Sequence, residues 1–121
     1  MSLKECFDRG LLRKTNIEED KVENSLKLAE HFLERAKGNL SKEYYDVAFL
    51  MVYNSMFHIA RALLFSKGYK ERSHYCLIAF LKEEFKDNEE LLEHLKLLDS
   101  YRISRHAIQY SGEACNEIDA R

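Results

Sequence analysis

The sequence contains no proline and only four glycines among its 121 residues. Proline interrupts helices and glycine favours tight turns, so their scarcity indicates long, uninterrupted helices. No apolar run reaches the roughly 20 residues that a membrane-spanning helix needs. The first residues, M-S-L-K-E-C-F-D-R, also lack the apolar segment of a secretory signal. We therefore expect an all-α protein that has no membrane association and lies in the cytoplasm.

The sequence also has only three cysteines and a small net charge. Cys6, Cys76 and Cys115 lie far apart without a C-x-x-C motif, which favours neither a disulfide framework nor a zinc knuckle. Such a pattern is most simply that of a protein in a reducing compartment. The formal net charge is −2 and the pI is near 6.2, so any nucleic-acid partner needs a local basic patch. The length predicts one domain, residues 1–121.

Apolar periodicity predicts an up-and-down bundle of four to five helices. The longest, from about Lys42 to Lys67, is apolar on more than one face, as in a helix packed by neighbours or by a second subunit. Capping boxes are predicted at 15–18 and 87–90, and Gly38 and Gly68 stand where helices should end. The other expected helices cover about residues 3–13, 15–37, the segment after Ser73, 89–110, and a truncated last helix after Gly112.

Side chains that could bind a ligand or take part in a reaction gather near the C-terminal end, in Y-R-I-S-R-H-A-I-Q-Y. Arg102, His106 and Tyr110 are spaced i, i+4, i+8, so their side chains share one helical face, and Arg105 flanks it. Two permanent cations, an imidazole and a phenol on one face predict a phosphate-binding site. The alternative is a solvated helix end, where cations meet the negative end of the helix dipole.

Three further polar residues are candidates for a cleft. His58 lies among apolar residues of the long helix and is interpreted as a satisfied core or interface histidine. Asn54 is its potential hydrogen-bond partner, or else points into the cleft. His74 opens the helix after Ser73 and either caps it or lines the cleft. Glu71 and His74 form one E-x-x-H match, whereas a di-iron site needs two, so no metal or cofactor is predicted.

Four segments, in order, resemble the HEPN domains (higher eukaryotes and prokaryotes nucleotide-binding) of the small stand-alone prokaryotic branch. They are V-E-N-S-L-K-L-A-E-H-F-L-E-R-A, A-F-L-M-V-Y-N-S-M-F-H-I-A-R-A-L-L, G-Y-K-E-R-S-H and R-I-S-R-H-A-I-Q-Y, within about residues 3–115. The resemblance implies a helical bundle that forms a homodimer, with the polar motif of each subunit at the dimer cleft. It also implies a toxin-like role beside a small nucleotidyltransferase.

Many HEPN domains cleave RNA without metal, using an Arg that is followed by four to six residues and a His. In such a site the Arg stabilises the phosphorane charge and the His moves the proton of the 2′-hydroxyl. Here three residues separate Arg102 from His106, and the fifth position after Arg105 is Tyr110. A non-catalytic module that binds and positions the nucleotidyltransferase is the alternative role. The candidate catalytic residues are Arg105, His106 and Tyr110, and the candidate ligands of an RNA or nucleotide phosphate are Arg102, Arg105, Asn54, His58 and His74.

Overall fold

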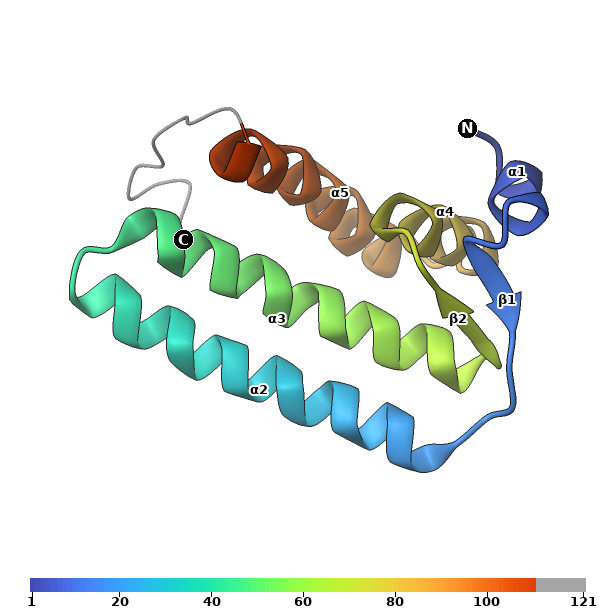
Figure 1. The fold of residues 1–121 in the computed structure, drawn as a ribbon, viewed down its shortest axis with the longest axis horizontal. Coiled ribbons are helices and arrows are strands. Elements are labelled where there is room, and N and C mark those ends of the chain that lie inside the picture. The colour runs from blue at the N-terminus through green and yellow to red at the C-terminus, as the bar shows by residue number, and fades with distance from the viewer. Residues whose placement is uncertain (111–121) are drawn as a thin grey trace.

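The computed structural model describes residues 1–110 as a helical bundle with a two-stranded ribbon at one end (Figure 1). The all-α bundle predicted from the sequence is confirmed, and the ribbon is an addition to it. The segment after Gly112, predicted to begin another helix, lies outside the described residues. The elements are α1 (Leu3–Asp8), β1 (Leu12–Lys14), α2 (Glu19–Ser41), α3 (Tyr45–Ser66), β2 (Tyr69–Glu71), α4 (His74–Glu84) and α5 (Glu89–Tyr110).

The central helix is α3, which lies between α2 on one side and α4 and α5 on the other (Figure 1). Tyr53, Phe57 and Leu64 of α3 are buried and share the main core with Leu77 of α4 and Leu98 of α5. By length and composition α3 could cross a membrane, but the core helix of a soluble protein meets the same criterion. The helix is therefore weak evidence for a membrane location, and the cytoplasmic location stays a prediction.

Small side chains allow α2 and α3 to pack closely. Ser55 of α3 is buried and donates a 2.7 Å hydrogen bond to the carbonyl of Ala29 in α2. The predicted helix end at Gly38 is wrong, because α2 continues through it to Ser41. Leu40, beyond the glycine, packs against the buried cluster of Ala48 and Phe49 in α3, so the extra turn of helix gains apolar burial.

Two helix starts also differ from the predicted capping boxes. The backbone N–H of Thr15 donates to the carbonyl of Gly68 at 2.9 Å, and α2 begins only after Glu18, which provides no side-chain cap. At the start of α5, the Oδ1 of Asn88 accepts a backbone N–H of the first turn at 3.0 Å. Asn88 therefore takes the capping role that the sequence assigned to Asp87, one residue earlier.

The first helix ends at Asp8 rather than near Arg13, because the chain turns into a strand. Gly10 makes this turn with a φ of +69°, in the region that glycine enters at little cost. Leu12 of β1 is 1% exposed and anchors the ribbon in the core. In the antiparallel register, Leu12 pairs with Glu71, Arg13 with Lys70 and Lys14 with Tyr69.

A disulfide joins Cys6 of α1 to Cys76 of α4, with their Cα atoms 5.8 Å apart. The interpretation that the cysteines form no disulfide is therefore wrong, because residues distant in sequence meet at the buried contact between these helices. The bond also removes the cysteine argument for a reducing compartment. It ties the N-terminal segment to the helix that carries His74.

Candidate functional site

His74 is held between α3 and α4. Ser73 caps α4 through its Oγ, which accepts the backbone N–H of Cys76 at 3.2 Å. The Nδ1 atom of His74 lies 2.7 Å from the hydroxyl of Tyr53, and its ring stacks on Phe57 with the centroids 3.8 Å apart. Of the two roles open from the sequence, capping belongs to Ser73, whereas His74 faces the contact between the helices.

Arg105 approaches the same tyrosine from α5. Its guanidinium carbon lies 5.2 Å from the centre of the Tyr53 ring, within the range of a cation–π contact. The Nε atom of Arg105 is buried and has no hydrogen-bond partner among residues 1–110. An unmade hydrogen bond at a buried group costs about 1–3 kcal/mol. Within residues 1–110, this guanidinium is thus incompletely satisfied.

Two more arginines border Tyr53 and His74, and a carboxylate pairs with each. Arg61 donates two hydrogen bonds to Glu71, at 2.6 Å from Nε and 3.2 Å from Nη2. Arg102 donates from Nε to Asp99 at 2.9 Å. Within the described part of the chain, Arg105 has no such ion pair. Among residues 1–110 it is therefore the arginine of this group whose charge no carboxylate compensates.

These surroundings keep His74 neutral. Burial lowers its pKa most, and the charges of Arg105 and Arg61 lower it further, to about 4. Burial also raises the pKa of the Tyr53 phenol to about 12, against the opposing charge of Arg105. Near pH 7 the phenol therefore keeps its proton and donates to Nδ1, since no other acceptor among residues 1–110 is bonded to it. The proton of His74 then lies on Nε2.

His58 extends the same group of rings toward α2. Its ring stacks on Phe32 with the centroids 5.4 Å apart, and its Nδ1 is buried without a partner in residues 1–110. Within residues 1–110 this Nδ1 therefore makes no hydrogen bond with Asn54, one of the two roles open for that residue, and the interpretation of His58 as a satisfied core or interface histidine stays a prediction. Its closest ring neighbours are phenylalanines, which offer no acceptor or donor. Burial and the charge of Arg61 lower its pKa.

The predicted site residues thus have different positions. Arg102 and Arg105 are near enough to His74 for their charges to lower its pKa. His106 is exposed on α5, and Asn54 is half-buried on α3. Tyr110 ends α5, but its side chain lies outside the described part of the chain. The cluster therefore combines the two α5 arginines with a histidine of α4.

Tyr53, which connects this cluster, is not among the site residues predicted from the sequence. The available signal was a tyrosine within an apolar helix, because a buried phenol needs a partner for its hydroxyl. Glu71 of the E-x-x-H match is bound to Arg61. No group of three or more side chains suited to a metal ion gathers within residues 1–110.

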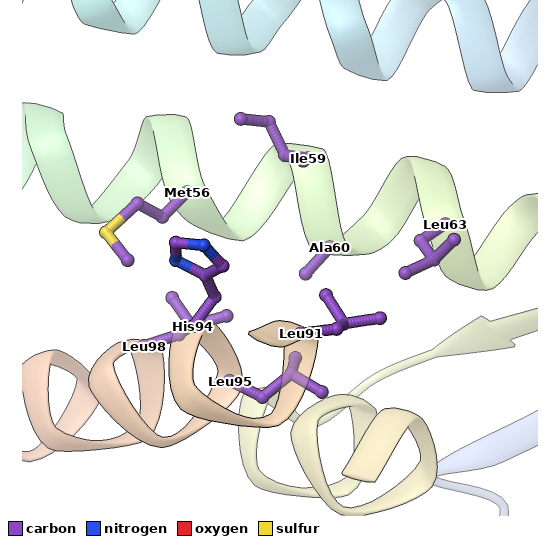
Figure 2. Close-up of a pocket in the computed structure, with 8 residues that line it drawn as sticks. All are labelled: Met56, Ile59, Ala60, Leu63, Leu91, His94, Leu95 and Leu98. Carbon is purple, nitrogen blue, oxygen red and sulfur yellow. The ribbon is translucent and has the colours of Figure 1, made fainter. Parts of the chain in front are cut away.

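A separate apolar hollow of about 230 Å³ lies between α3 and α5. Figure 2 shows Met56 and Ile59 of α3 on one side, with Leu91 and His94 of α5 on the other. Ile59 is 53% exposed at its edge. This surface offers apolar contact and little hydrogen bonding, so its chemistry differs from that of the arginine cluster.

Comparison with known proteins matches residues 22–120 to the HEPN domain. A curated Methanocaldococcus jannaschii protein named "Putative toxin MJ0142" is 34% identical over 85 residues. This alignment covers 67% of the present chain and 58% of that relative, so the chain spans little more than half of the relative's length. No solved structure is similar enough to match. The resemblance inferred from the sequence is confirmed: the chain belongs to the HEPN domain family.

Proposed function

We propose that this HEPN protein has a toxin-like role and binds an RNA or nucleotide phosphate at Arg105. The observation that carries the proposal is the position of Arg105, which lies over Tyr53 beside a neutral His74 without a carboxylate partner in residues 1–110. A phosphate would supply the missing acceptor and the missing negative charge. The similarity to a protein named as a toxin supports the role, and the family supports the ligand class.

The pairing of the neighbouring arginines favours binding of one phosphate at a defined position. Glu71 and Asp99 hold Arg61 and Arg102 in fixed geometry. These cations therefore add to the positive electrostatic potential at the site without competing with Arg105 for the oxygen atoms of the phosphate. The Nε2–H of His74 is an additional donor. Negative charge brought by the phosphate would raise the pKa of this imidazole toward the range in which it can transfer a proton.

Cleavage of the bound RNA without metal is the reaction that we propose for this site. The 2′-hydroxyl attacks the adjacent phosphorus, which forms the cyclic phosphate and breaks the bond to the leaving 5′-oxygen. His74, protonated on both ring nitrogens once the bound phosphate has raised its pKa, would give its Nε2 proton to that leaving oxygen and return to the neutral imidazole, while Arg105 would stabilise the charge on the phosphorane. The proton of the 2′-hydroxyl would pass to solvent or to a second base.

The binding test compares Arg105→Ala with the wild type, by fluorescence anisotropy of a labelled single-stranded RNA. We expect the affinity to fall about 10- to 100-fold, the range of one charged hydrogen-bonded contact. Lys96→Ala is the matched control, since Lys96 is an exposed cation on the same helix and pairs with Glu93. Equal affinity of Arg105→Ala and the wild type would refute this site.

The cleavage test uses the same RNA in excess EDTA. We expect the wild type to cut the RNA, whereas His74→Asn should bind it and leave it intact. If both proteins leave the RNA intact although both bind it, the site binds without cleaving. In that case the second candidate function applies.

The second candidate is a non-catalytic module that binds and positions a nucleotidyltransferase. Exposure of His106 favours it, since this imidazole, adjacent in sequence to Arg105, lies outside the cluster around Tyr53. Co-expression with a nucleotidyltransferase encoded beside this protein, followed by size-exclusion chromatography, tests the association. Co-elution together with no cleavage in EDTA would favour this candidate over the nuclease.

We also propose that the protein forms a homodimer through the surface around the apolar hollow. Ile59 of α3, which lines the hollow and is exposed at its edge, supports this, because such a side chain gains by burial against a second copy. Light scattering at micromolar concentration should give twice the monomer mass, and Ile59→Glu should give the monomer mass. A wild-type monomer at this concentration would contradict the proposal.

A further inference from the structure

The outward face of the β1–β2 ribbon carries cations at successive paired positions. Arg13 stands directly opposite Lys70 in the antiparallel register. Arg72 continues the same face, because its N–H donates to the carbonyl of Leu11 at 2.9 Å and so extends the register by one pair. Arg13, Lys70 and Arg72 are all exposed. These three residues are here named the ribbon patch.

Like charges directly opposite each other in a ribbon are destabilising. No carboxylate among residues 1–110 forms an ion pair with Arg13, Lys70 or Arg72. The carboxylate on the ribbon, Glu71, lies on the inward face, where its side chain is 3% exposed and bound to Arg61. Within its described residues, a protein of net charge −2 thus concentrates unpaired positive charge on this small surface.

The side chain of Arg13 lies against the backbone at Gly10. A Cβ atom placed on Gly10 would lie 2.9 Å from its Nη2 atom, so the guanidinium packs over the glycine. Gly10 immediately precedes Leu11, the residue whose carbonyl binds Arg72. The guanidinium of Arg13 is therefore directed back along the ribbon, toward the end where Arg72 stands.

We propose that the ribbon patch binds the phosphate backbone of a single-stranded RNA that continues from the Arg105 site. This inference rests on the proposed function. The chain leads from Arg72 through Ser73 directly to His74, so the ribbon patch adjoins the cluster in sequence. The inward face of the same ribbon holds Arg61 through Glu71. An RNA strand anchored at the cluster can therefore reach the outward face of the ribbon over a short path.

The chemistry of the ribbon patch favours the phosphate backbone of RNA over an acidic protein surface. Protein interfaces are centred on buried apolar and aromatic anchors. The ribbon patch instead consists of three cations on one face of the ribbon: Arg13, Lys70 and Arg72. Such positions suit contacts to phosphate oxygens, which fix a strand on a protein without selecting its sequence.

The double variant Arg13→Gln/Lys70→Gln tests the inference without threatening the fold, because it removes a repulsive pair. Its melting temperature should equal or exceed that of the wild type. Its affinity for a single-stranded RNA of about 20 nucleotides should fall about tenfold, and the slope of log K against log salt should decrease by about 1.4. A dinucleotide, which reaches only the Arg105 site, should bind both proteins equally.

The matched control is Lys37→Gln/Lys96→Gln, which removes two exposed lysines of α2 and α5. It should leave the affinity for the long RNA and the salt slope at wild-type values. If Arg13→Gln/Lys70→Gln also behaves like the wild type while Arg105→Ala loses binding, the ribbon inference is overturned and the proposed function stands. If Arg105→Ala binds normally and the ribbon variant does not, the proposed site fails and the ribbon patch binds RNA by itself. Wild-type protein that binds polyglutamate but no RNA would assign the ribbon patch to an acidic protein and refute the inference.

Discussion

Tyr53 and His74 are joined by a 2.7 Å hydrogen bond, which connects the middle of α3 to the first residue of α4. Arg105 of α5 lies over the ring of the same tyrosine. One phenol thus contacts the candidate acid and the candidate phosphate ligand. The relative placement of three helices at this site therefore depends on Tyr53.

The variant Tyr53→Phe should lower the free energy of unfolding by about 1–2 kcal/mol, because it leaves the Nδ1 of His74 without its donor. Urea denaturation measures the change. Tyr44→Phe is the control, since Tyr44 is 56% exposed, and it should unfold like the wild type. Equal stability of both variants would show that the hydrogen bond contributes nothing to folding.

Acidification should destabilise the protein through His74. Its pKa is about 4 in the folded protein, against an ordinary value of 6.5, so between these values the unfolded chain binds a proton that the folded one does not. The stabilisation is complete above pH 6.5 and is lost as the pH falls toward 4; with allowance for partial exposure, we expect a loss of about 1–2 kcal/mol. Urea denaturation at several pH values in this range should show that the free energy of unfolding depends less on pH in His74→Asn than in the wild type. A wild-type dependence of the unfolding free energy on pH in His74→Asn would contradict the assignment.

The variant Glu71→Gln should destabilise the protein by about 2–3 kcal/mol, because it leaves the charge of Arg61 unpaired at a partly buried position. The side chains of Glu71 and Arg61 are 3% and 30% exposed, respectively. Glu83→Gln provides the control, since its pair with Lys86 is exposed on both sides, and should change stability by less than about 0.5 kcal/mol. Similar urea midpoints for the two variants would mean that burial of the Arg61 pair has no energetic effect.

Removal of the disulfide in Cys6→Ser/Cys76→Ser should lower the free energy of unfolding by about 2–4 kcal/mol, the range for a bond that closes a long loop. The two cysteines are 70 positions apart. Thermal denaturation measures the effect, and Cys115→Ser is the control that keeps the pair. Mass spectrometry of a non-reduced digest should find the Cys6 and Cys76 peptides linked. Free thiols at both positions would contradict this bond.

The sequence predicts those parts of the fold that depend on local signals. Ser73 begins α4 because a serine before an apolar run can cap a helix, and α3 follows from its continuous apolar character. Other boundaries depend on distant partners. Thr15 is bound to Gly68, and α2 passes Gly38 because the following turn packs on α3. Periodicity along one segment contains no information on such pairs.

The candidate site shows the same division. The spacing rules for a single helix predict Arg102 and Arg105 as site residues, because both belong to one continuous segment. They could not associate Arg105 with Tyr53 or His74, which come from other helices. Tyr53 and His74 are 21 positions apart, and packing of α4 against α3 brings them together.

The pairing of α2 with α3 has a consequence for local opening of the protein. Tyr53, His74 and Arg105 lie on α3, α4 and α5, whereas α2 packs mainly along the opposite side of α3. Leu26 and Leu33 of α2 are 46% and 43% exposed, so this helix has little cover beyond its contact with α3. Elements with few neighbours open at lower free energy than the rest of a protein. Backbone amides of α2 should therefore exchange with deuterium earlier than those of α3, while the Tyr53–His74 contact stays closed.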